Sequence, residues 1–494
     1  MLIFHMKNKI FFNLFIHYSI YIIAALSFAY FLDISMPDDG LRHISFANNI
    51  DLMKNWGEVF PYSLFTTYDP WFLWHELLSF LMLFIDYEYI HIFVNFLVFL
   101  ILLIIVDIFI RRGIKYNFDT FIYIIVFSVV FLSANRYIMV RPDLLSGLYV
   151  LISLLLKNRL VPIFLLTLIY SPFYYLFFIY TGSIGLVVLI QKKWKLFFGV
   201  FLGSLFSLII HLLYDMEGYI LTVKNILIDQ SLRMGLEVSE GKPLFDLFGH
   251  LNYFILLPLF FIAGYFLIYK NYKYFKENSL ALFLLITSIL WINQIRYFVL
   301  FLPIIIIYII SIIANLNKKS FLNRIRMYLI FMKKYISYSK KAVLFYIIAI
   351  PYCIFAFSYA FNTKSLNKDT EEAKFFKNII FNEKTILLNN LHADLYKALY
   401  YNPTIKFIPS CSVGWFDDKD KKMKDIYIRM QKTKGINEKE LFSLIKYVNA
   451  DYYIHYLRNK KQTLDFDKLR NFGIIPEMIY KNRIIFRIKR EINE

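Results

Sequence analysis

Apolar runs of about 20 residues recur along the first 361 residues of this chain, and they limit its possible folds more than any other feature. Hydrophobic residues make up 59% of the sequence and charged residues 18%, against about 25% charged residues in typical soluble domains. This composition excludes a soluble enzyme, a disulfide scaffold and a disordered chain. It predicts a polytopic α-helical membrane protein.

A helix needs about 20 apolar residues to cross the hydrocarbon core of a bilayer. Eleven candidate spans meet or approach this length, at residues 10–32, 88–110, 119–134, 144–156, 160–170, 173–190, 196–214, 251–269, 280–292, 297–315 and 342–361. Several are short, and short spans suit helices whose ends line a water-filled cavity. We therefore expect about eleven transmembrane helices in a membrane domain of residues 1–361.

The distribution of Lys and Arg predicts the orientation, because cytoplasmic loops are enriched in them. With a cytoplasmic N-terminus, the inner segments hold 21 of these residues, the outer loops 8 and the chain after residue 361 the remaining 26. The tail should then be extracytoplasmic. Topology explains much of the net charge of +19, so the charge does not indicate a nucleic-acid partner.

Carboxylates show the opposite bias, since nine Asp and Glu residues lie between Asp33 and Glu88 on the outer side. Two outer loops, 33–87 and 215–250, are too long for simple connections. The first contains amphipathic pieces at Leu41–Trp56 and Trp71–Ile85, and the second is a polar loop that carries Arg233 and could form a lid.

The tail, residues 362–494, is predicted to be a small extracytoplasmic α/β domain. Its expected helix is Glu438–Val448. The expected strands are Thr385–Leu388, Ile405–Ile408, Tyr452–Tyr456, Ile474–Tyr480 and Arg483–Ile488, the last two forming a hairpin. Its basic excess is compatible with an acidic glycan or lipid surface, or with a solvated Lys-rich face.

The first polar constellation, Pro37-Asp38-Asp39-Gly40-Leu41-Arg42-His43, follows the first predicted span. A turn and a helix N-cap would explain its acids, because Asp accepts hydrogen bonds from unpaired backbone N–H groups. The alternative is a carboxylate that acts as a general base or a metal ligand at the mouth of a cavity.

Two arginine-containing loops form the second and third constellations. Arg136 and Arg141-Pro142-Asp143 share one short outer loop, although Asp143 could simply favour a helix N-terminus. Arg296-Tyr297 begins a late span, where a cation is unfavourable unless an anion lies beside it. A guanidinium matches phosphate oxygens, so a phosphate is the simplest such anion.

The fourth constellation is Asp69-Pro70-Trp71-Phe72-Leu73-Trp74-His75-Glu76. A Trp-rich stretch can be a membrane-interface anchor, but His75 and Glu76 within an apolar stretch require polar partners. The sequence contains no Gly-rich phosphate loop, no paired CxxC and no HExxH spacing, which argues against nucleotide hydrolysis and a zinc hydrolase.

Together these motifs resemble the GT-C-fold glycosyltransferases, polytopic enzymes that use polyprenyl-phosphate sugars. Asp38-Asp39 with Arg42-His43 resembles their first-loop acidic motif, and Arg141-Pro142-Asp143 resembles their second outer-loop acid. Asp69 to Glu76 is similar to their His-containing segment. Arg296-Tyr297 followed by Pro303 resembles the start of a late span. The layout is like that of bacterial aminoarabinose and mannosyl transferases, without their His-Pro-Pro-Leu form.

The resemblance implies an inverting transfer, in a bacterial inner membrane, from a polyprenyl-phosphate-linked sugar to an extracytoplasmic glycan, lipid or protein. Asp38 or Asp39 would be the base. Asp143 would orient the acceptor or, with Asp39, bind a divalent cation such as Mg or Mn. Substrate contacts are expected from Arg42, His43, His75, Glu76, Arg136, Arg141, Arg233, Arg296 and Tyr297. A transporter or flippase of a lipid-linked sugar, or an oligosaccharide polymerase or ligase, remains an alternative.

Overall fold

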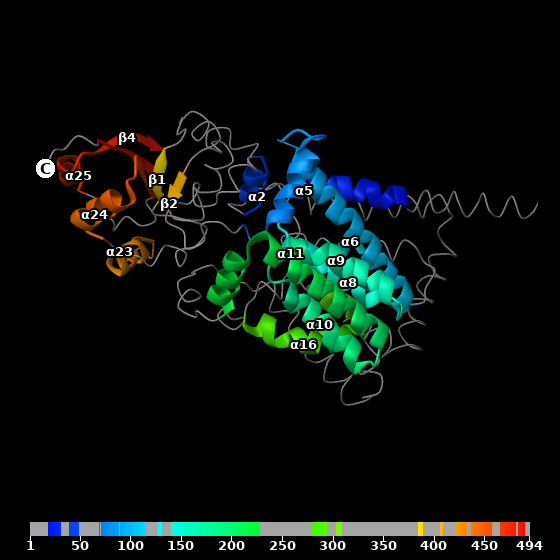
Figure 1. The fold of residues 1–494 in the computed structure, drawn as a ribbon. Coiled ribbons are helices and arrows are strands. Elements are labelled where there is room, and N and C mark those ends of the chain that lie inside the picture. The colour runs from blue at the N-terminus through cyan, green and yellow to red at the C-terminus, as the bar shows by residue number, and fades with distance from the viewer. Residues whose placement is uncertain are drawn as a thin grey trace, which may run out of the picture.

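The computed structural model describes residues 18–30, 39–48, 69, 71–87, 89–114, 126–130, 140–227, 279–293, 303–308, 384–388, 406–408, 420–431, 436–456, 465–480 and 483–489. Its earlier part is helical and its part after residue 384 contains both strands and helices. Figure 1 shows the later strands and helices gathered at one end of the molecule, and most of the earlier helices packed together at the other.

The helices of the earlier part coincide with many of the predicted apolar runs. They are α2 (Asp39–Asn48), α5 (Phe72–Met82), α6 (Ile90–Ile114), α8 (Asp143–Leu155), α9 (Leu160–Tyr170), the 3-10 turn η1 (Ser171–Phe173), α10 (Phe177–Ile190), α11 (Trp194–Leu227) and α16 (Ser279–Asn293). Further helical residues lie at 18–30, 126–130 and 303–308, inside three other predicted spans. The predicted spans 251–269 and 342–361 lie outside the described residues.

Two described helices, within α6 and α11, are long and apolar enough to cross a membrane. Helices α8, α9 and α10 have 13, 11 and 14 residues, so at 1.5 Å per residue they are shorter than the hydrocarbon core of about 30 Å. The expected number of eleven spans therefore stays a prediction.

Helix α11 corrects part of one prediction. The span was expected to end at residue 214, and the helix does break directly after it, but the segment expected as a polar loop begins with a second helical stretch that reaches Leu227. The backbone leaves helical geometry at Asp215, with φ −162° and ψ 98°. The Asp215 carboxylate accepts a hydrogen bond from the Gly218 N–H over 2.9 Å, so it caps a second helical segment. Local capping, which hydropathy does not detect, begins this second segment.

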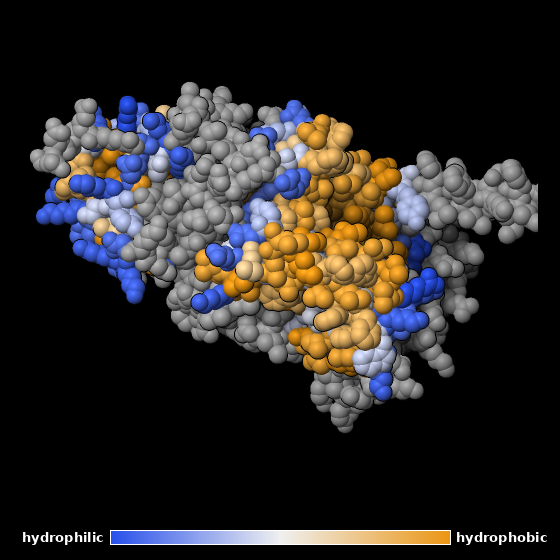
Figure 2. Space-filling view, in the orientation of Figure 1, coloured by the Kyte–Doolittle hydropathy of each residue, from blue (hydrophilic) through white to orange (hydrophobic). Residues whose placement is uncertain are grey.

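A broad apolar surface covers the helical part. Figure 2 shows hydrophobic residues over its visible face, while hydrophilic residues gather on the described C-terminal part. Exposed apolar side chains include Leu165, Ile169, Phe198, Phe201, Leu205 and Leu213. Monomeric soluble proteins rarely expose apolar patches larger than a few hundred Å². This surface is of the kind that lipid tails cover.

Helices α9 and α11 pack closely because glycines line their contact. A Cβ atom added at Gly199 would lie 2.4 Å from Cγ2 of Ile163, and one added at Gly203 would lie 2.7 Å from Cβ of Thr167. Small residues let helix backbones approach, which favours van der Waals packing inside a membrane. Between α8 and α9, the hydroxyl groups of Tyr149 and Thr167 form a hydrogen bond of 3.1 Å.

The C-terminal elements form a five-stranded mixed sheet in the order β2-β1-β3-β5-β4. The strands are β1 (Thr385–Leu388), β2 (Lys406–Ile408), β3 (Tyr452–Tyr456), β4 (Ile474–Tyr480) and β5 (Arg483–Ile488), with helices α23 (Lys421–Gln431), α24 (Glu438–Val448) and α25 (Phe466–Asn471). Strand β1 is parallel to both β2 and β3, whereas β3 and β4 are antiparallel to β5. The predicted hairpin and the predicted helix 438–448 are confirmed, and β2 begins one residue later than expected.

Candidate active site

The described structure brings two of the predicted constellations together where α2 packs against α5. Nδ1 of His43, on α2, lies 2.7 Å from Nε2 of His75, on α5. Nδ1 of His75 in turn lies 2.5 Å from a carboxylate oxygen of Asp69. The two imidazoles and the carboxylate therefore form a continuous chain of hydrogen bonds between segments 26 or more positions apart.

Trp71 joins the same group of side chains. Its backbone N–H donates to the other oxygen of Asp69 over 2.9 Å. The guanidinium carbon of Arg42 lies 4.6 Å from the centre of the Trp71 ring, a cation–π contact. We call Asp69, Trp71, His75, His43 and Arg42 the Asp69 cluster.

The Asp69 cluster is buried. Exposed fractions are 1% for His43 and His75, 2% for Asp69 and 3% for Arg42. Water does not reach such groups easily, so each must be satisfied within the protein, and charges there interact more strongly than at a surface. Glu76, the next residue after His75, is exposed.

The second predicted constellation lies next to α5. The indole Nε1–H of Trp74 donates to the backbone carbonyl of Val140 over 3.1 Å. Val140 is buried and has φ 47°, a left-handed conformation that is strained for a β-branched residue. It directly precedes Arg141-Pro142-Asp143, and Asp143 is the first residue of α8.

The kink in α11 also contacts α5. The ring of Phe72 stacks on the ring of Tyr214, with centroids 4.0 Å apart and planes at 8°. The same Phe72 meets the edge of the buried His211 ring at 5.7 Å. Aromatic contacts thus link α5 to the point where α11 bends.

The predicted site residues differ in their location and in whether the structure describes them. Arg42, His43 and His75 belong to the Asp69 cluster, Glu76 is exposed beside it, and Arg141 is partly buried at the start of α8. The side chains of Asp39 and Asp143 lie outside the description, although their backbones begin α2 and α8. The remaining predicted residues also lie outside the described part of the chain: Asp38, Arg136, Arg233, Arg296 and Tyr297.

Sequence reasoning placed Asp69 and Trp71 in a Trp-rich stretch without giving them a role. The signal was present, since His75 in an apolar stretch requires a polar partner and Asp69 is the nearest acid on its N-terminal side. Spacing alone did not show that the carboxylate reaches back to His75 by way of the turn before α5.

Among the described residues, no three His, Cys, Asp or Glu side chains form a group that could hold a metal ion. Both ring nitrogens of His75 are already within hydrogen-bond distance of protein atoms, so that ring has no lone pair left for a metal. The side chains of the predicted cation ligands, Asp39 and Asp143, lie outside the described residues.

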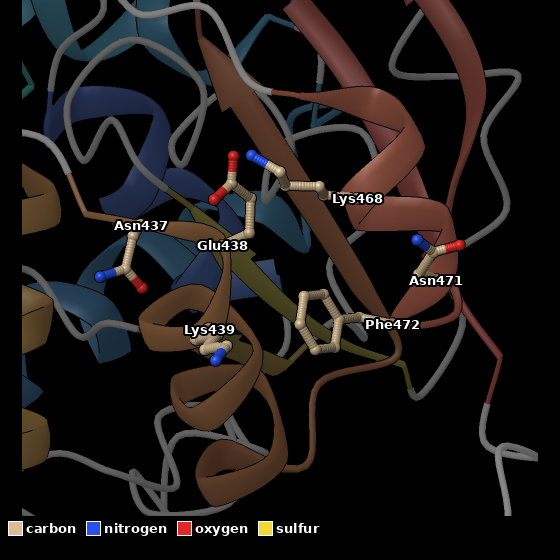
Figure 3. Close-up of a pocket in the computed structure, with 6 residues that line it drawn as sticks. All are labelled: Asn437, Glu438, Lys439, Lys468, Asn471 and Phe472. Atoms are coloured by element: carbon tan, nitrogen blue, oxygen red, sulfur yellow. The ribbon is translucent and has the colours of Figure 1, made fainter.

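A second candidate site lies among the C-terminal elements, in a cavity of about 370 Å³ between the start of α24 and the end of α25. Its lining residues are Asn437, Glu438, Lys439, Lys468, Asn471 and Phe472. Figure 3 shows Glu438 and Lys468 extending toward one another across it. Asn437 already caps α24 by accepting the Glu440 N–H, so the helix terminus is satisfied internally. This cavity has no catalytic arrangement comparable with the Asp69 cluster.

No protein-family model matches this chain, and no curated protein matches its sequence. Among solved structures, the chain is similar to the oligosaccharyltransferase of Archaeoglobus fulgidus, crystallised in complex with Zn and sulfate. The identity is 12%, the match covers 88% of this chain and 68% of that chain, and the TM-score is 0.49. A likeness of this size does not assign a function.

Proposed function

We propose that this protein is an integral membrane glycosyltransferase of the GT-C type, which moves a sugar from a polyprenyl-phosphate donor to an extracytoplasmic acceptor with inversion. The observation that carries the proposal is the meeting of three distant motifs around α5. His43 and Arg42 reach α5 from the start of α2, and Trp74 ties α5 to the turn before Asp143. Sequence resemblance assigns these same motifs to one active site.

The chemistry requires a base and a site for the leaving phosphate. As the acceptor oxygen attacks the anomeric carbon, its O–H proton passes to the carboxylate of Asp38 or Asp39. The bond between the anomeric carbon and the phosphate oxygen breaks, and the electron pair leaves with the prenyl phosphate. Asp39 is the first residue of α2, one helical turn before His43, which supports its place beside the Asp69 cluster.

Cationic side chains would stabilise the departing phosphate. Arg296 and Arg141 are assigned to its oxygens, because a guanidinium donates two parallel hydrogen bonds to phosphate. Asp143, at the positive end of α8, is assigned to orient the acceptor hydroxyl or to hold a divalent cation.

The membrane setting follows from the apolar runs and from the exposed apolar surface of the helical part (Figure 2). With the N-terminus in the cytoplasm of a bacterial inner membrane, the long loops and the C-terminal sheet face outward. The donor would then be used on the outer leaflet. Protease accessibility of an epitope at the C-terminus tests this orientation, and a cytosolic epitope would contradict the proposal.

One observation favours a second candidate, a proton-coupled transporter of a lipid-linked sugar. Chains of Asp, Glu and His within membrane proteins often carry protons, and Asp69, His75 and His43 form such a chain. A transporter would use the same cationic residues without breaking the sugar–phosphate bond.

Incubation of the purified protein with a labelled polyprenyl-phosphate sugar separates the two candidates. Release of prenyl phosphate supports the enzyme, and translocation in proteoliposomes without release supports the carrier. Asp38→Asn combined with Asp39→Asn, and Asp143→Asn alone, should each lower release at least about 10²-fold. The matched control is Asp86→Asn, the same change at an exposed residue after α5. Undiminished release in folded Asp38→Asn, Asp39→Asn protein would refute the assigned base.

A further inference from the structure

We infer that Asp69 and His75 are positioning residues, which hold His43 and thereby the acidic first turn of α2 against α5. The inference rests on the proposed function, in which that turn supplies the catalytic carboxylate. It gives His75 a different role from the substrate contact expected from sequence. Neither Asp69 nor His75 would touch the sugar.

Several contacts depend on the carboxylate of Asp69. One oxygen of Asp69 accepts the Trp71 N–H, and the other accepts from His75. The Arg42 guanidinium lies over the Trp71 ring, and His75 is hydrogen bonded to His43. These are two side-chain contacts that α2 makes with this segment, and Asp69 supports both of their partners.

The carboxylate of Asp69 also sets the direction of the hydrogen bonds to the two imidazoles. An ionised carboxylate only accepts hydrogen bonds, so the proton on this side of His75 lies on Nδ1. When the His75 ring is neutral, Nε2 is then an acceptor, and Nδ1–H of His43 donates to it. Asp69 therefore determines the tautomers of both imidazoles, which fixes the ring orientation of each.

Asp69, His75 and His43 are each at least 97% buried, so water cannot easily replace a lost partner. A polar network that is complete and buried holds its members rigidly, whereas a broken one leaves an uncompensated polar group. Asp39 follows the same helix one turn earlier, so movement of His43 would move the start of α2.

Two substitutions test separate parts of this inference. His75→Phe keeps a ring of similar size but removes both hydrogen bonds. Asp69→Asn is isosteric, and its side-chain oxygen can still accept the Trp71 N–H. Its amide N–H would face Nδ1 of His75, so that ring must shift its proton to Nε2.

Hydrogen exchange of full-length protein in detergent measures the position of α2 without any need for activity. In His75→Phe, the backbone amides of residues 39–48 should exchange about tenfold faster than in the wild type. The control is His211→Phe, another fully buried histidine, which packs against aromatic rings of α5, α10 and α11. Its exchange over residues 39–48 should stay at the wild-type rate. Equal exchange over these residues in His75→Phe and the wild type would overturn the inference.

Nitrogen-15 NMR of protein labelled at histidine measures the tautomer. The His75 resonances, assigned by their loss in His75→Phe, should show protonation at Nδ1 in the wild type and at Nε2 in Asp69→Asn. The control Asp86→Asn should leave them unchanged. If Asp69→Asn also leaves them unchanged, Asp69 does not set the tautomer and the inference fails.

In active protein, His75→Phe should lower kcat about 10²-fold, while the KM for the donor stays within about threefold. An unchanged kcat would overturn the positioning role. Absence of sugar transfer by the wild type would instead contradict the proposed function, since the exchange and NMR results do not depend on activity.

Discussion

The close contact between α9 and α11 predicts that Gly199→Ala destabilises the protein. The new Cβ would lie 2.4 Å from Cγ2 of Ile163 and 2.8 Å from the backbone oxygen of Leu160. The Ile163 side chain could rotate, but the Leu160 oxygen belongs to a helix backbone, so the two helices would have to separate. Overpacking of this kind costs about 1–3 kcal/mol, against a gain of about 1 kcal/mol when Ala replaces Gly in a helix.

Gly182, on α10, provides the matched control, because it is exposed and a Cβ there meets nothing within 4 Å. Gly182→Ala should stabilise the protein by about 0.4–1 kcal/mol, through the lower entropy of the unfolded chain. The two variants carry the same chemical change and should shift the free energy of unfolding in opposite directions.

Far-UV circular dichroism during unfolding in mixed detergent and SDS micelles measures that free energy for both variants and the wild type. We expect the order Gly182→Ala, wild type, Gly199→Ala, from most to least stable. If Gly199→Ala is as stable as Gly182→Ala, the helices are not in the close contact described here. Gly203→Ala should agree with Gly199→Ala, because its Cβ would lie 2.7 Å from Cβ of Thr167.

Three further predictions concern single interactions. Trp74→Phe removes the hydrogen bond to the Val140 carbonyl and should cost about 1 kcal/mol in the same unfolding assay, so a neutral effect would contradict that bond. Burial lowers the pKa of His455 from 6.5 to about 4, so the unfolded chain takes up a proton first and stability should fall as pH drops from 6.5 toward 4; His455→Gln should flatten this part of the profile of unfolding against pH. Hydrogen bonds from Arg429 lower the pKa of the Glu440 carboxyl below its ordinary pKa of 4.5. The ion pair therefore stabilises the fold above pH 4.5, and this stabilisation is lost as the pH falls through the lowered pKa. The free energy of unfolding of Arg429→Gln should therefore be lower than that of the wild type near neutral pH, and the difference should shrink on acidification. A difference that is constant with pH would be inconsistent with the ion pair.

Much of the secondary structure was predictable because it depends on neighbours along the chain. The helix at 438–448 has a capping box, in which Asn437 and Glu440 satisfy each other's backbone N–H groups. The hairpin of β4 and β5 has two short β-rich runs separated by two residues, and Tyr480 pairs with Arg483 as that spacing requires. The helical segment after Asp215 was missed because hydropathy averages over a window and does not register one capping carboxylate.

The candidate site was predictable in its residue types but not in its connections. Apolar positions on α2 identified its buried face, and Leu41, Ile44 and Ala47 are indeed buried. The same pattern does not say that His43, on that helix, meets His75 rather than another polar group.

The amino-acid sequence alone indicates which stretches are apolar enough for a membrane, where many helices and strands begin and end, and which polar residues stand in unfavourable surroundings. These properties depend on spacing and composition within a few turns of chain. The contacts of Asp69 with His75, of Trp74 with Val140 and of Gly199 with the α9 backbone come from the packing of distant elements. Such pairings depend on which faces of distant elements pack together, and a hydrogen bond or a close contact forms only when both partners arrive within a few ångströms.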